Sequence, residues 1–62
     1  MTTPTDTQIL TTFRARKADA EFRTPGGKLT DEDLRGVIRT TANIHRVDLP
    51  RVLALVMAEG EL

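Results

Sequence analysis

Few side chains in this sequence could do chemistry, and most of those have a simpler use in a helix. The chain has no serine and no cysteine, so the commonest nucleophiles of covalent catalysis are missing. The adjacent acids Asp31-Glu32-Asp33 suggest a metal or general-base site, but consecutive helical residues point in different directions. Acids at the start of a helix are fully explained by capping and by the helix dipole.

Two further features suggest catalysis or nucleotide binding. His45 falls on the apolar face of a predicted helix, which is typical of a core or interface histidine rather than a catalytic one. The segment Gly26-Gly27-Lys28-Leu29-Thr30 lacks the first glycine of a Walker A loop, and its threonine does not directly follow the lysine. We therefore expect no enzymatic activity, no cofactor, no metal and no small-molecule substrate.

The basic residues offer a different chemistry, namely contacts to the phosphates of a nucleic acid. Arg35, Arg39 and, if the helix reaches it, Arg46 fall within about 40° of one another on a helical wheel. With Arg23 and Lys28 from the preceding turn, they are candidate nucleic-acid contacts. Alternatively, they are ordinary solubilising residues. Nine basic residues against nine acidic ones give a formal net charge of zero, so the whole molecule has no net attraction to nucleic acid or membrane.

Two short stretches resemble parts of DNA-binding proteins. Arg23-Thr24-Pro25-Gly26-Gly27-Lys28 is similar to the wing turn of MerR-type and excisionase winged-helix proteins, where a helix also follows. Those families place a helix-turn-helix before the wing, whereas residues 1–20 supply one helix. Residues 42–55 resemble a helix-turn-helix, but Arg46 replaces the usual turn glycine, and the second helix offers apolar residues where base edges are read. The chain is assigned to neither family.

Start and stop signals divide the sequence into helices at residues 5–22, 30–45 and 48–59. The expected fold is all-α, a compact three-helix domain over residues 5–60 that follows a frayed tail at residues 1–4. Each of the first two helices should bury one of its faces. These faces comprise Ile9, Phe13, the stem of Lys17 and Ala20 on the first helix, and Leu34, Val37, Ile38, Thr41, Ile44 and His45 on the second.

The helix ends are predicted from capping residues. Thr5 and Gln8 form a capping box, Thr30 is a second N-cap, and Asp48 is a third. Gly60 ends the last helix and leaves residues 61–62 loose.

The connection between the first two helices has two interpretations. The Pro-Gly-Gly turn at residues 25–27 joins them directly, or residues 21–24 and 28–29 pair as a very short hairpin. Phe22 lies opposite the buried face of its helix, so either the helix ends before it or Phe22 makes a second contact.

The last predicted helix carries more apolar surface than one buried face requires. Its apolar residues spread over about 200° of the wheel, roughly twice the stripe of a surface helix. A 62-residue chain without disulfides is usually stabilised by oligomerisation or a partner. We expect a non-enzymatic protein-interaction module that self-associates, as a homodimer, through this helix. The candidate interface residues are Val52, Leu53, Leu55, Val56 and Met57.

Other interpretations of the same features stay open. The last helix could instead be the buried centre of a monomeric bundle, or could dock into the groove of a different protein. The alternative function is a small DNA-binding regulator that uses the basic residues named above. No membrane span or signal peptide is evident, so we expect a cytoplasmic protein, and the abundant alanine, arginine and threonine fit a high-GC bacterium or its phage.

Overall fold

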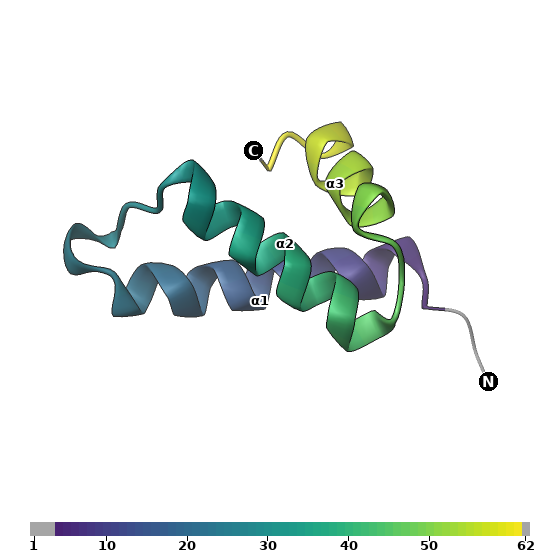
Figure 1. The fold of residues 1–62 in the computed structure, drawn as a ribbon, viewed down its shortest axis with the longest axis horizontal. Helices are drawn as coiled ribbons and strands as arrows, with labels where there is room; N and C mark the ends of the chain where they lie inside the picture. The colour runs from purple at the N-terminus through teal and green to yellow at the C-terminus, as the bar shows by residue number, and fades with distance from the viewer. Residues whose placement is uncertain (1–3, 62) are drawn as a thin grey trace.

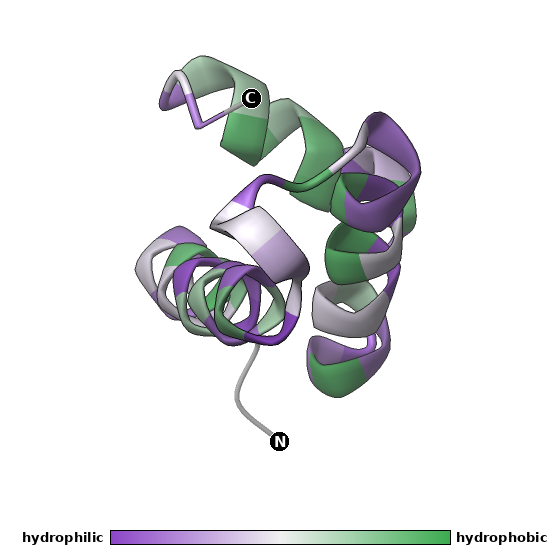
Figure 2. Cartoon of the chain, turned by 90° about the vertical axis from the view of Figure 1, so that its left-hand side faces the viewer, coloured by the Kyte–Doolittle hydropathy of each residue, from purple (hydrophilic) through white to green (hydrophobic). Residues whose placement is uncertain are grey.

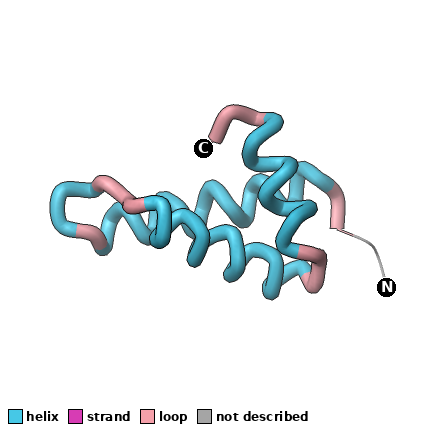
Figure 3. Tube along the Cα trace, turned by 45° about the horizontal axis from the view of Figure 1, so that its top comes forward, coloured by secondary structure: helices cyan, strands magenta, loops and turns pink. Residues whose placement is uncertain are grey.

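Three α-helices make up most of residues 4–61, the part of the chain that the computed structural model describes (Figure 1). They are α1 (Asp6–Arg23), α2 (Asp31–His45) and α3 (Leu49–Ala58), with a short 3-10 helix, η1 (Pro25–Gly27), between the first two. No strand forms among residues 4–61, so the short hairpin is absent and the all-α prediction is confirmed (Figure 3).

The helices α1 and α2 form an antiparallel pair, and α3 packs across one end of it. That end is where α1 begins and α2 ends, whereas η1 closes the opposite end (Figures 1 and 3). The described chain extends 39 × 20 × 16 Å, so the short α3 covers only part of the long axis.

Capping boxes start the first two helices, as the sequence predicted. Thr5 Oγ1 accepts a hydrogen bond from the Gln8 N–H (3.2 Å), and Gln8 Oε1 accepts one from the Thr5 N–H (2.8 Å). Thr30 and Asp33 make the same reciprocal pair at α2. Each box satisfies two N–H groups that have no partner within the helix. Asp48 occupies the N-cap of α3, but its side chain makes no capping hydrogen bond.

The hydrophobic core lies where the three helices of residues 4–61 meet. It consists of Ile9, Leu10 and Phe13 from α1, Val37, Ile38 and Ala42 from α2, and Val52 and Val56 from α3. Thr41 is also buried, and its hydroxyl donates to the Val37 carbonyl (2.9 Å). No residue from Arg14 to Arg23 is fully buried, so the buried part of α1 is its first half.

Three expectations about the helix faces and the ends of the chain need correction. Ile44 was expected on the buried face of α2 but is 46% exposed, and it lines an open hollow beside α1. Glu61 was expected to be loose, yet its carboxylate accepts a 2.6 Å hydrogen bond from Arg14 Nε. Pro4 was placed in a frayed tail, but its carbonyl accepts a hydrogen bond from Arg51 (3.2 Å). The rest of that tail, residues 1–3, and residue 62 lie outside the described residues.

The corner between α2 and α3 depends on a left-handed residue. Val47 N–H donates to Ala42 O (3.1 Å) and Arg46 N–H to Asn43 O (3.4 Å), which is the Schellman pattern of a helix end. This pattern requires a left-handed backbone at Arg46, with φ 54° and ψ 44°. A similar ending follows α3, where glycine supplies the positive φ at Gly60. The sharp corner therefore uses an unfavourable residue type.

Arg46→Gly should raise the stability of the fold. A non-glycine residue in the left-handed region costs about 1–2 kcal/mol, and part of the gain is lost because glycine makes the unfolded chain more flexible. We expect a net gain of about 0.5–1 kcal/mol, seen in thermal unfolding as a rise in Tm of roughly 2–8 °C. Arg46→Ala is the control because it removes the charge but keeps the Cβ. An equal rise in both variants would attribute the effect to the arginine charge.

Candidate functional site

The apolar surface of α3 is divided between the core and the outside. Val52 and Val56 are 0% exposed and belong to the core. Leu53 and Leu55 lie about 80° to either side of the Val52–Val56 line and are half-buried. Met57 is 62% exposed. Most of α3 is accordingly coloured as hydrophobic in Figure 2.

The charged residue within α3 faces away from this apolar surface. Arg51 Nη2 donates to the Pro4 carbonyl (3.2 Å) and lies 3.3 Å from Asp6 Oδ1, so it ties the start of α3 to the start of α1. The side of α3 that carries Leu49, Leu53 and Met57 is left without a charged side chain of its own.

Beside this side of α3 lies a groove of about 490 Å³, which we call the α2–α3 groove. Four aliphatic side chains line it, two from each helix, and they are Leu34, Ile38, Leu49 and Leu53. Arg35, Arg39 and Asp31 supply its polar edge. Leu49 is 40% exposed there, and Met57 continues the apolar strip one turn beyond Leu53. The groove thus combines an apolar floor with two cationic side chains.

The structure separates the basic residues that the sequence grouped together. Arg35 and Arg39 share the α2–α3 groove, but Arg46 lines a different hollow beside Thr7 and Gln8 of α1. The predicted line of three arginines required α2 to continue to residue 46, and the helix ends at His45. Of the other two candidate contacts, Arg23 is exposed with Asp19 at 3.3 Å, and Lys28 is exposed after η1.

His45 has a structural hydrogen bond. Its Nε2 lies 2.7 Å from Thr12 Oγ1, which joins the end of α2 to α1, and the residue is half-buried. Among residues 4–61, no three His, Cys, Asp or Glu side chains gather where they could hold a metal ion.

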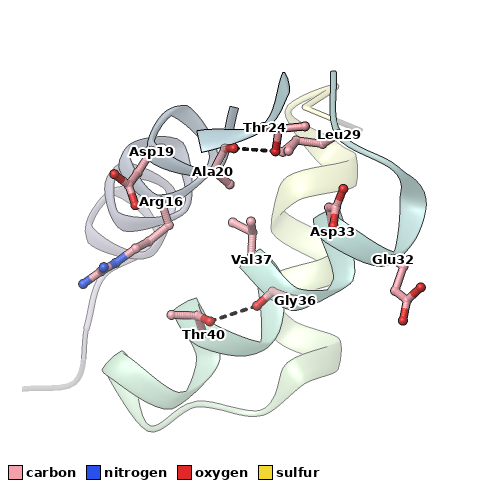
Figure 4. A pocket seen from close by; sticks show the side chains of 10 residues that line it. All are labelled: Arg16, Asp19, Ala20, Thr24, Leu29, Glu32, Asp33, Gly36, Val37 and Thr40. Carbon is pink, nitrogen blue, oxygen red and sulfur yellow. Dashed lines mark hydrogen bonds between the residues drawn. The ribbon is translucent and has the colours of Figure 1, made fainter. Parts of the chain in front are cut away.

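A further hollow, between α1 and α2 near η1, does not assemble reactive groups (Figure 4). The charged ends of Arg16 and Glu32 point away from it. The hydroxyls of Thr24 and Thr40 donate to backbone carbonyls four residues earlier, at Ala20 (2.8 Å) and Gly36 (2.9 Å). This arrangement offers no converging acid and base.

The residues that line the α2–α3 groove were recognised from the sequence, but the sequence did not predict that they would meet in one groove. Leu34 and Ile38 were expected to be core, and Leu49 was counted only as part of a wide apolar arc. These residues come together because the chain turns sharply at residues 46–48, between α2 and α3. Helical periodicity does not define the angle of that turn.

The chain matches no protein-family model, no curated protein and no solved structure. In the described part of the chain, the helices are too short or too polar to cross a membrane. The α2–α3 groove is the feature from which a function can be argued.

Proposed function

We propose that the protein is a non-enzymatic protein-interaction module that self-associates through the α2–α3 groove. The observation that carries this proposal is the groove itself, in which Leu34, Ile38, Leu49 and Leu53 line a solvent-open space of about 490 Å³. Recognition of an amphipathic helix typically uses such an apolar floor between two helices.

The composition of the surface around the groove supports the same proposal. Arginine and methionine are enriched at protein interfaces, and here Arg35 and Arg39 line the groove while Met57 extends it. A methionine side chain adapts easily to a partner's shape. The expected interface therefore comprises Leu49, Leu53 and Met57 with the two arginines, rather than the buried Val52 and Val56.

Self-association would also stabilise a chain that is too short to build a large core. A 62-residue chain has a limited core, and disulfides are excluded here because cysteine is absent. Covering the aliphatic groove would bury further apolar surface, at roughly 25 cal/mol per Å² removed from water. Association and folding would then support each other.

A DNA-binding regulator has less support from the same geometry. Phosphate contacts need several basic side chains on one surface, and the groove brings together only Arg35 and Arg39 of the five candidates. The exposed side of α3 offers Ala54 and Met57, which cannot read base edges through hydrogen bonds.

The proposal is tested by sedimentation equilibrium over a wide concentration range. Refractive-index detection is needed because the chain has no Trp or Tyr. We expect the wild-type chain to associate and Leu53→Glu to weaken association at least about 100-fold, because a carboxylate would be desolvated in the groove. Ile44→Glu is the matched control, since it also places a glutamate at a solvent-exposed aliphatic position but lies outside the groove.

The outcomes separate the alternatives. A wild-type chain that stays monomeric at every concentration, or a Leu53→Glu variant that associates like the wild type, would reject the proposal. In that case a titration with duplex DNA follows, and binding that weakens steeply with salt would support the DNA-binding alternative.

A further inference from the structure

Phe22 is the most exposed large hydrophobic side chain of the described residues. It is 90% exposed on the last turn of α1, whereas Phe13, the other phenylalanine, is 0% exposed. The helix continues past it to Arg23, so the sequence alternative in which the helix ends earlier does not occur. The last turn of α1 lies at the end of the molecule next to η1, away from α3 (Figure 1).

The surroundings of Phe22 make a narrow apolar strip with acidic neighbours. Ala15, Ala18 and Phe22 are exposed and fall within an arc of about 60° on the wheel of α1. Asp19 and Glu21 lie on either side of this strip. Asp19 already pairs with Arg23 at 3.3 Å, but both side chains are largely exposed, so this pair is readily exchanged for another.

We propose that Phe22 of one copy inserts into the α2–α3 groove of the next copy, so that the copies associate head to tail. This inference rests on the proposed function, because it names the segment that fills the groove. The projecting aromatic and the groove are on different parts of the same chain, which is the arrangement that produces a heterologous contact.

Size and charge make the two surfaces complementary. A groove of about 490 Å³ is within the range of roughly 300–1,000 Å³ that holds whole small-molecule ligands, so a phenyl ring fits. Arg35 and Arg39 at the groove are opposite in charge to Asp19 and Glu21 beside Phe22. The acid at the groove, Asp31, is likewise opposite in charge to Arg23 of the incoming turn. A guanidinium above the ring adds a cation–π contact.

The test uses two variants that disable different halves of the contact. Phe22→Glu loses the inserted side chain and keeps the groove, and Leu53→Glu loses the groove and keeps Phe22. Each variant alone should be monomeric. An equimolar mixture should form a 1:1 heterodimer and nothing larger, because one intact Phe22 and one intact groove remain. Phe22→Ala should weaken the association between copies about 10- to 100-fold. Phe22→Leu is the matched control, and it should weaken the association less because it keeps an apolar side chain.

Sedimentation of the separate and mixed variants distinguishes the models. If Phe22→Glu associates like the wild type while Leu53→Glu does not, the head-to-tail contact is wrong and the proposed function stands through another contact at the groove. If both variants are monomeric and their mixture stays monomeric, the inference is also overturned. A monomeric wild type overturns both proposals. Circular dichroism confirms folding, and Leu49→Glu at the same groove replaces Leu53→Glu if the latter unfolds.

Discussion

Phe13→Ala is expected to lower the free energy of unfolding of this protein by about 3–5 kcal/mol. Phe13 is 0% exposed and is the largest fully buried side chain of the described core. Truncating a buried phenylalanine to alanine costs about 3–5 kcal/mol, because apolar contacts are lost and a cavity remains. A natural domain is stable by about 0.05–0.15 kcal/mol per residue, so a chain this short has roughly 3–9 kcal/mol in total. The single substitution therefore removes roughly a third or more of the folding free energy.

The second phenylalanine provides a matched control on the same helix. Phe22→Ala makes the same chemical change at a side chain that is 90% exposed, so the free energy of unfolding should change by less than about 0.5 kcal/mol. Both variants are compared by urea unfolding followed by circular dichroism, at concentrations low enough to keep the protein monomeric. Similar losses in the two variants would contradict the assignment of Phe13 to the core and Phe22 to the surface.

The sequence predicted the helices because their start signals are local. Thr5 with Gln8 and Thr30 with Asp33 are three residues apart, and each pair makes its hydrogen bonds within one turn. No distant residue is needed for such a capping box. The helix boundaries and the all-α class could therefore be predicted without knowledge of the tertiary structure.

The packing of the helices could not be predicted in the same way. A helical wheel places Ile44 near the buried Val37, yet Ile44 is 46% exposed and lines an open hollow beside α1. Burial also depends on how closely the neighbouring helix packs, which the wheel of a single helix does not describe. The wheel likewise could not show that α2 would end in a left-handed Arg46, because such an ending usually has glycine.

The candidate site was predicted only in part, for a related reason. The apolar residues of α3 and the pair Arg35 and Arg39 were both recognised, but as features of two competing functions. The structure unites them because the corner at residues 46–48 brings residues 31–39 alongside residues 49–53. A site built across a corner depends on the angle between two helices, and sequence periodicity describes each helix alone.

The division of α3 into a buried and an exposed side leads to a second large expected effect. Val56→Asp should prevent stable folding, because Val56 is 0% exposed and a carboxylate there would be desolvated among aliphatic side chains. Placing an unpaired charge in a core typically costs about 4 kcal/mol or more, which is comparable to the whole stability of a domain this small. The measurement is the helical circular dichroism signal and its loss on heating.

Met57→Asp is the control that separates core from interface. Met57 is the next residue of the same helix turn, so both aspartates have the same unfavourable position near the end of α3, which costs about 0.3–1 kcal/mol. Met57 is 62% exposed, so its variant should stay folded and lose at most some self-association. If Val56→Asp instead folds normally and loses only association, Val56 must lie at an interface between copies. The sequence-based assignment of Val56 would then be correct, and α3 would pack on the other helices through a different face.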